Sequence, residues 1–176
     1  MTIPDKMKAV LLAEYNPNLI RALGKMKLAG DVAIPKPGKG EVLIKLEASP
    51  INPSDIAFLR GDYNIVKPLP AVTGFEGAGI IVETGKQIDS GLLGRHVSFF
   101  NQQKNSGAWA EFTAVNIENV ILHHYDLPAE QAACMFVNPF TAYALIEHIL
   151  ENKHTGIIQS ASNSQVGEFV RYFARM

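Results

Sequence analysis

The chain has 176 residues, 47% of them hydrophobic, which is enough for one ordinary globular domain with a core, or for one domain and part of a second. Its formal net charge is −1, with 16 basic residues against 17 acidic ones. This balance gives no indication of a nucleic-acid partner.

Cysteine content and hydropathy narrow the class of protein further. Cys134 is the only cysteine, so the chain cannot form an internal disulfide or a thiolate zinc cluster. The N-terminus lacks the apolar core of a signal peptide, and no apolar run approaches the length of a membrane span. We therefore expect a cytoplasmic protein with no membrane partner.

Short runs of strand-forming residues, separated by glycine and proline turns, follow one another through the first 125 residues. The clearest is Glu41–Ser49, where Val42, Ile44 and Leu46 share one face, as in a half-buried strand. Residues 19–33 lack periodicity and are expected to form a loop or an irregular hairpin. The pattern predicts a mainly β fold with some α, a twisted barrel-like domain over residues 1–125. Further strands are expected at residues 8–15, 78–84, 96–100, 107–115 and 119–123.

One irregular stretch in this domain is expected to carry the chemistry. A short helix is predicted at residues 55–59, with Asn52 or Ser54 as its N-cap. Tyr63 follows this helix, and a tight glycine turn at residues 74–79 leads into the next strand. We expect the loop and the helix to direct Tyr63 towards a cleft.

The character of the sequence changes after residue 125. Helix-forming residues predict one helix at 129–136 and a second at 140–151, with Asn138 as the N-cap and Pro139 in the first turn. The second helix is expected to bury apolar residues at helical spacing, namely Tyr143 or Ala144, then Leu145 and Ile149.

The last residues predict the opening of a nucleotide-binding βαβ unit. A strand at 156–161, a polar turn at 162–165 and a helix at 166–174 follow in that order. No second strand follows. The sequence therefore predicts two parts, a β domain over 1–125 and, over 126–176, a helical connection with the start of a truncated Rossmann domain.

Five stretches of the sequence carry a family resemblance: Ile51–Asp55, Arg60–Tyr63, Leu69–Gly77, Val137–Tyr143 and Ala161–Gly167. Together they resemble the zinc-independent branch of the medium-chain dehydrogenase/reductase superfamily. The last two are most similar to the 2-enoyl thioester reductases, with quinone oxidoreductases as the next nearest group. The resemblance implies a GroES-like β domain followed by a Rossmann domain.

The resemblance implies that Tyr63 is the proton donor. A phenol with the ordinary pKa of about 10 is protonated at neutral pH and can give a proton to an enolate or bind its oxyanion. In enoyl reductases the residue at this place is that donor, and quinone reductases often carry a tyrosine here too. The alternative is a loop tyrosine with a packed ring.

Trp109 is expected to be a core or half-buried strand aromatic rather than a cleft residue, and Glu76 a buried hydrogen-bonding carboxylate.

The resemblance also implies NADPH as the cofactor. Asn138 could equally act only as a helix cap. Of the three glycines in a dinucleotide fingerprint, only Gly167 is present. The zinc-binding relatives carry a cysteine near Asn52 and a histidine where this chain has Phe75, so no metal is expected. The implied cofactor-binding residues are Asn52, Asn138, Thr141, Asn163, Ser164, Gln165, Val166 and Gly167.

Three functions follow from this reading. The first is an NADPH-dependent reduction of a conjugated C=C bond, in an enoyl thioester. The second is quinone reduction. The third is a catalytically inactive fragment or interaction module, because half of the cofactor domain is missing, and for that reason we expect weak or no NADPH binding. Residues 156–176 would also expose an unpaired strand and an apolar helix face, so we expect possible self-association as a homodimer.

Overall fold

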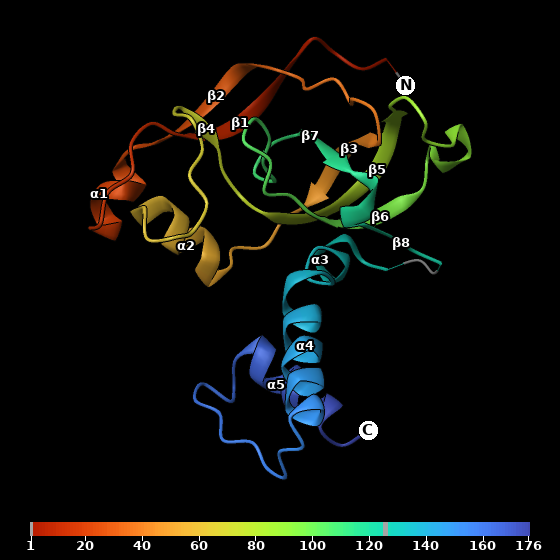
Figure 1. Ribbon diagram of the computed structural model, residues 1–176. Helices are drawn as coiled ribbons and strands as arrows, with labels where there is room; N and C mark the ends of the chain where they lie inside the picture. The colour runs from red at the N-terminus through yellow and green to blue at the C-terminus, as the bar shows by residue number, and fades with distance from the viewer. Residues whose placement is uncertain (1, 125–126) are drawn as a thin grey trace. The chain divides into compact units, whose positions relative to one another are not determined.

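The computed structural model describes residues 2–124 and 127–176. The chain divides into two compact units, Met1–Cys134 and Met135–Met176 (Figure 1). The observed division follows Cys134, nine residues beyond the boundary predicted from the sequence. Each unit is described by itself.

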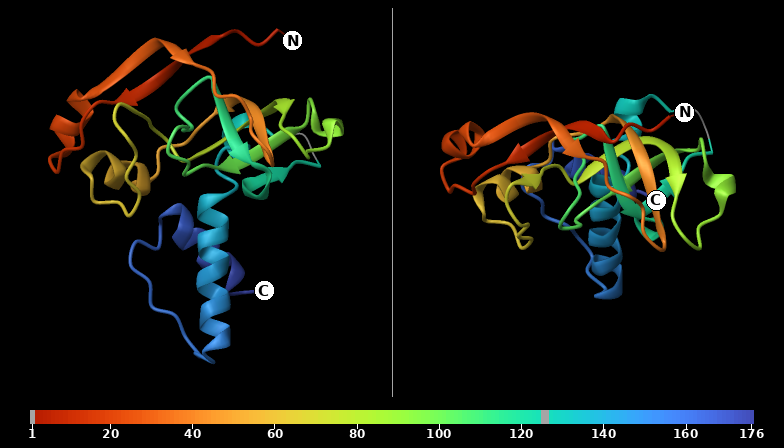
Figure 2. Two further views of the ribbon diagram at one scale, coloured as in Figure 1. Left: turned by 45° about the horizontal axis from the view of Figure 1, so that its top comes forward. Right: turned by 90° about the horizontal axis from the view of Figure 1, so that it is seen from above.

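The first unit is built on two antiparallel sheets. One sheet has the order β2-β1-β4 and the other the order β7-β3-β5-β6-β8. Figure 2 shows the β1–β2 pair lying across the five-stranded sheet from two further directions. The strands are β1 (Lys6–Leu12), β2 (Met26–Ala33), β3 (Glu41–Ala48), β4 (Ala71–Val72), β5 (Glu76–Thr84), β6 (His96–Phe100), β7 (Phe112–Asn116) and β8 (Val120–Leu122).

Strand β3 contributes side chains to two apolar clusters of the first unit, one on each of its faces. Val42 and Ile44 face a core with Ile81 of β5, as the alternating pattern predicts. Leu43 points to the opposite face and packs with Met7 of β1 in a second buried cluster. Both faces of β3 are therefore covered, because the β1–β2 layer lies over the face that carries Leu43.

The predicted β-rich architecture is confirmed, with corrections in two places. Residues 19–33 form a helix, α1 (Leu19–Gly24), and then β2, which pairs with β1. Asn18 caps α1 by accepting a hydrogen bond from the backbone N–H of Arg21 at 3.1 Å, which the sequence reading missed. The strand predicted at 107–115 begins only at Phe112. Residues 108 and 109 instead donate backbone hydrogen bonds to Gly74 and Thr73.

Short helices complete the first unit. The helix α2 (Pro53–Arg60) lies beside α1 at one end of the β structure (Figure 1). A four-residue helix, α3 (Ala129–Ala132), packs its buried alanine against Ala78 of β5. Two short 3-10 turns, η1 (Ser90–Leu92) and η2 (Ile117–Asn119), lie between strands.

The second unit consists of α4 (Val137–Glu151), α5 (Gln165–Phe173) and the segment between them. Ala142 and Ile146 of α4 are buried against Val170 of α5. The predicted face was wrong, because Tyr143 and Leu145 are 52% and 46% exposed. Hydrophobic residues surround most of α4, and contact with α5 decides which of them are covered.

The strand predicted at residues 156–161 does not form. A strand exists through ladder hydrogen bonds to a neighbour, and none of the described strands pairs with this segment. The following helix is confirmed as α5. The expectation that no apolar run reaches the length of a membrane span was also wrong, because Ala129–Glu151 passes by length and composition. This is weak evidence for a span, since α3 ends at Ala132 and α4 begins at Val137.

Candidate active site

The helix α2 and its two caps place Tyr63. Asn52 is the N-cap residue, and the Asp55 carboxylate accepts the backbone N–H of Asn52 at 2.7 Å. Pro53 occupies the first turn, where its missing N–H is not needed. Gly61 ends the helix with φ of 77°, in the left-handed region that glycine adopts without strain. The chain therefore turns sharply just before Tyr63.

Tyr63 is half-buried, and its ring and its hydroxyl have different neighbours. The ring packs on Phe75, with 5.4 Å between ring centroids and an interplanar angle of 33°. The phenolic oxygen accepts a hydrogen bond from Nε2 of Gln102 at 3.3 Å. The ring is fixed by apolar packing while the oxygen lies at a polar edge, an arrangement suited to a group that must present a proton.

Two buried carboxylates, Asp55 of α2 and Glu76 next to Phe75, lie in the same region of the first unit. Glu76 is 1% exposed, and its Oε2 accepts a hydrogen bond from Nδ2 of Asn52 at 2.8 Å. Its predicted role as a buried hydrogen-bonding carboxylate is confirmed. Asp55 is 2% exposed. Burial, together with the charge of Glu76, raises the pKa of Asp55 to about 6, against the opposing effect of backbone N–H donors and of the Lys67 charge.

Lys67 is the buried cation of the same region. Its Nζ donates to the carbonyl oxygens of Ser106 at 2.5 Å and Val72 at 3.4 Å. The amine also lies 5.2 Å from the centroid of the Phe75 ring. Burial lowers the pKa of Lys67 to about 8, although the nearby Asp55 charge favours the protonated amine. The cation therefore ties the segment after Tyr63 to the nearby backbone at Val72 and to the backbone at Ser106, 39 residues away in the chain.

The glycine turn into β5 also shapes the site. Gly74 has φ of 80°, and a Cβ on it would lie 2.4 Å from the indole of Trp109. Trp109 is half-buried against this turn and donates from Nε1 to the carbonyl of Pro50 at 3.2 Å. It is therefore the half-buried aromatic that the sequence predicts. The turn needs glycine because an indole fills the space of a side chain.

The first unit contains a polar contact that the sequence reading missed. His123 is half-buried, and its Nε2 lies 2.7 Å from Oγ of Ser98. Ser98 donates its single hydroxyl proton to the carbonyl of Ala132. Nε2 of His123 must then be the donor to Ser98. Among residues 2–124 and 127–176, no group of three or more His, Cys, Asp or Glu side chains is placed to hold a metal ion.

Two predicted cofactor residues lie at the start of α4. The helix begins at Val137 with Phe136 as its N-cap, so the predicted capping role of Asn138 was wrong. Pro139 is compatible with this longer helix because backbone N–H groups in the first turn have no helical acceptor. Thr141 is exposed, and its hydroxyl donates to the carbonyl of Val137 at 2.6 Å. A contact of Asn138 or Thr141 with a cofactor stays a prediction.

The turn before α5 brings the backbone of Gly167 close to the backbone of Ala161 and Ser162. Ser164 caps α5 by accepting the N–H of Gly167 at 3.1 Å. A Cβ at Gly167 would lie 2.7 Å from the carbonyl oxygen of Ser162, so only glycine fits. Arg171, in the last turn of the helix, donates a hydrogen bond back to this same carbonyl. A glycine-closed turn at a helix N-terminus fits the backbone approach that a dinucleotide pyrophosphate requires.

The predicted site residues form two groups in the structure. Asn52 and Tyr63 belong to the first unit, where both border the region of Phe75 and Glu76. The others lie at the starts of α4 and α5 in the second unit. Asn163, Ser164 and Gln165 are exposed, Val166 is half-buried and Gly167 is buried.

The alcohol dehydrogenase GroES-like domain model matches residues 38–126, just over half of the chain. The chain therefore belongs to this family, within the medium-chain dehydrogenase/reductase superfamily. It is 39% identical over 142 residues to the mitochondrial enoyl-acyl-carrier-protein reductase of Xenopus tropicalis, covering 80% of this chain and 40% of that protein. It is 34% identical over 169 residues to the enzyme of the same name from Bos taurus, covering 95% and 43%.

A solved structure extends the likeness into the second unit. A Mesorhizobium loti protein, provisionally assigned as an NADPH:quinone reductase, superposes with a TM-score of 0.87 at 34% identity. The match covers 99% of this chain and 53% of that one. This confirms the predicted fold class, a GroES-like domain with part of a Rossmann domain. The chain spans about two fifths of the length of the curated relatives.

Proposed function

We propose that the chain is part of a zinc-free, NADPH-dependent oxidoreductase that reduces the conjugated C=C bond of an enoyl thioester. The observation that carries this proposal is Tyr63, whose ring is fixed on Phe75 while its phenolic oxygen accepts a bond from Gln102. The enoyl reductase relatives, at 34% to 39% identity, support the substrate class.

In this reaction the chain supplies the proton. Bound NADPH supplies a hydride to the β-carbon of the enoyl thioester. Tyr63 gives its phenolic proton to the α-carbon, so the O–H bond breaks, a C–H bond forms and the electron pair stays on the phenolic oxygen. Before that transfer the same hydroxyl can stabilise the thioester oxyanion by a hydrogen bond.

The second unit supplies the candidate cofactor contacts. We propose that the turn Asn163–Gly167 receives the pyrophosphate, because Gly167 lets the start of α5 pack closely against the backbone of the preceding residues, as in a dinucleotide-binding turn. The guanidinium of Arg171, held at Ser162 of that turn, adds a positive charge suited to phosphate. Asn138 and Thr141 are proposed to contact the nicotinamide end, and Asn52 of the first unit stays a candidate cofactor-binding residue.

Quinone reduction is the second candidate, favoured by the Mesorhizobium loti structure. The two reactions differ in their need for Tyr63. An enoyl thioester must receive a proton at carbon, whereas a reduced quinone carries its protons on oxygen, which exchanges them with water. Loss of the Tyr63 hydroxyl should therefore abolish enoyl reduction and affect quinone reduction much less.

The test is NADPH oxidation by the chain with a short enoyl-CoA and with a quinone, each with product analysis. Tyr63→Phe should lower the enoyl-CoA rate by about 100-fold or more. Tyr172→Phe, which removes the hydroxyl of a 62% exposed tyrosine, is the matched control and should leave the rate unchanged. Turnover of the quinone alone would overturn the enoyl proposal.

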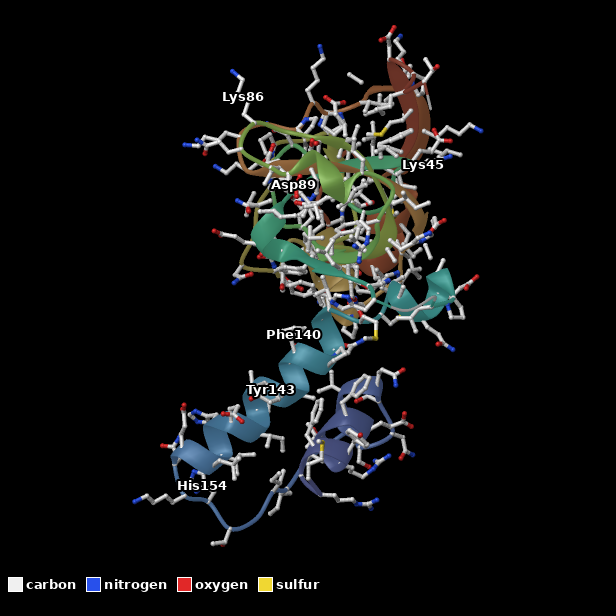
Figure 3. All side chains as sticks on the ribbon, turned by 90° about the vertical axis from the view of Figure 1, so that its right-hand side faces the viewer. Lys45, Lys86, Asp89, Phe140, Tyr143 and His154 are labelled. Carbon is white, nitrogen blue, oxygen red and sulfur yellow. The ribbon has the colours of Figure 1, made fainter. Side chains whose placement is uncertain are left out.

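A third candidate is that these residues act as an interaction module without turnover. Its support is the second unit, which exposes large apolar side chains, among them Phe140 at 54%, Leu150 at 62% and Ile158 at 103%. Phe140 and Tyr143 of α4 are labelled in Figure 3, and with Pro139 and Phe173 they line an open hollow of about 310 Å³. A homodimer formed through this unit would elute early in size exclusion, and Leu150→Glu should restore the monomer.

Cytoplasmic location stays a proposal that cell fractionation would test.

A further inference from the structure

We propose that Gln102 is a positioning residue for Tyr63: it donates to the phenolic oxygen, so that the phenolic proton is left free for the substrate. This inference deepens the proposed function and rests on it. Gln102 lies in the loop after β6, and Tyr63 follows α2, 39 residues earlier in the chain. Neither the sequence pattern nor the family resemblance pointed to Gln102.

Donor and acceptor chemistry defines what this contact does. The distance from Nε2 of Gln102 to the phenolic oxygen is 3.3 Å, and a side-chain amide nitrogen can only donate. The phenolic oxygen is therefore the acceptor, and its own proton is not used in the contact. A phenol that donated to a neighbouring acceptor would instead keep its proton inside the protein.

The residue before Gln102 anchors the loop. Asn101 is 1% exposed, and its Nδ2 lies 2.8 Å from Oγ1 of Thr113 and 3.1 Å from Oγ of Ser106. Its backbone N–H donates to the carbonyl of Phe75 at 2.6 Å. Because buried hydrogen-bonded networks hold one conformation, the loop presents Gln102 from a fixed point.

The same residue, Phe75, connects both partners of the contact. Its carbonyl holds Asn101, and its ring packs against the ring of Tyr63 at 5.4 Å and against Phe58 at 5.1 Å. Donor and acceptor are thus fixed to one buried aromatic residue. A catalytic group gains most from such support, since small displacements of reacting atoms reduce the rate strongly.

The contact gains strength as the proton leaves. When the phenolic O–H bond breaks and the α-carbon takes the proton, the negative charge of the enolate moves to the phenolate oxygen. The amide N–H of Gln102 then donates to a charged oxygen, and such bonds are shorter and roughly twice as strong as neutral ones. The interaction is stronger after transfer than before, which favours kcat over substrate binding.

Two substitutions test whether Gln102 acts as a hydrogen-bond donor to the Tyr63 oxygen. Gln102→Met keeps the shape of the side chain and removes the donor, and we expect kcat to fall about tenfold with KM within about twofold. Gln102→Glu replaces the donor with a carboxylate that only accepts, so the phenol would donate its hydrogen bond to the introduced carboxylate instead of to the substrate. We expect kcat to fall about 100-fold. In a Tyr63→Phe background neither change should lower the rate further.

The adjacent Gln103 provides the matched control. Its Nε2 donates to Oε1 of Glu41 at 2.7 Å, so its side chain makes a contact of the same kind away from Tyr63. Gln103→Met should leave kcat and KM within about twofold of wild type. Equal losses in Gln102→Met and Gln103→Met would show that only loop stability is affected, and this would overturn the proposal.

A readout without turnover separates this inference from the proposed function. In protein labelled with ¹³Cζ-tyrosine, the chain gives up to five phenol signals, and Tyr63→Phe identifies the one from Tyr63. Gln102→Met should shift that signal, and Gln103→Met should not. An unmoved signal would overturn the inference even if the chain reduces enoyl-CoA. A shifted signal in a chain that reduces no substrate would instead overturn the proposed function and leave the contact established.

Discussion

The two units of the molecule differ in how they treat polar groups. In the described residues, all buried polar or charged side chains lie in the first unit, including Asp55, Lys67, Glu76 and Asn101. The second unit buries Ala142, Ile146, Gly167 and Val170, all apolar or glycine, and leaves many large apolar side chains exposed. The first unit can therefore hold a reactive hydroxyl in a fixed geometry, whereas the second offers backbone turns and open apolar faces.

The largest difference is expected when the same substitution is made in both units. Phe75→Ala removes a ring that is 1% exposed and contacts Phe58, Tyr63 and Lys67. We expect the free energy of unfolding to fall by about 3–5 kcal/mol. Phe140→Ala removes a ring that is 54% exposed, and we expect a loss of about 1 kcal/mol or less. Urea denaturation measures both, and similar losses would refute the contrast between the units.

Lys67 gives the next largest effect, at alkaline pH. Its folded pKa of about 8 is below the ordinary 10.5, so between these values the unfolded chain binds more protons than the folded one. The stability of wild type should rise by about 3 kcal/mol across this window, and Lys67→Met should remove the rise. Lys104→Met, at an exposed lysine, is the control and should keep it. If the stability of Lys67→Met rose with pH as much as that of wild type, the rise could not come from deprotonation of Lys67.

Asp55 gives a similar or slightly smaller effect at acid pH. Its folded pKa of about 6 is above the ordinary 3.8, so the folded chain holds the proton more tightly. The stability that this group contributes is complete below about pH 4 and is lost as the pH rises through 6. Asp55→Asn should therefore exceed wild type by about 3 kcal/mol at pH 8 and by nothing near pH 4. Asp62→Asn, at an exposed carboxylate just after the same helix, is the control, and a pH-independent difference for Asp55→Asn would contradict the account.

The smallest effect belongs to the second unit. Ser164→Ala removes the side chain that caps α5, and we expect about 1 kcal/mol less stability for that helix. Hydrogen exchange should show faster exchange in residues 165–173 and no change in the β strands. Asn163→Ala, at the exposed neighbouring position, should leave exchange unchanged. Faster exchange throughout the chain would mean that the two units do not unfold separately.

Local patterns in the sequence predicted most of the first unit. Alternation predicts β3, and an Asn-Pro pair before an apolar turn predicts the start of α2, because both signals depend only on neighbouring residues. The buried face of α4 could not be predicted, because it is chosen by contact with α5. Burial of Lys67 also gave no signal, since its acceptor Ser106 lies 39 residues away. The sequence therefore predicted Tyr63 as a candidate site residue, but it gave no indication of Lys67 or Gln102 near it.

The most direct test of the account is a titration of the chain with NADPH, followed by nicotinamide fluorescence, for wild type, Gly167→Ala and Gly156→Ala. A Cβ at Gly167 would meet the carbonyl of Ser162 at 2.7 Å, whereas nothing lies within 4 Å of one at Gly156. The account predicts weak but saturable binding that Gly167→Ala weakens at least tenfold and Gly156→Ala leaves unchanged. Equal binding by all three proteins would contradict the proposal that this turn receives the cofactor.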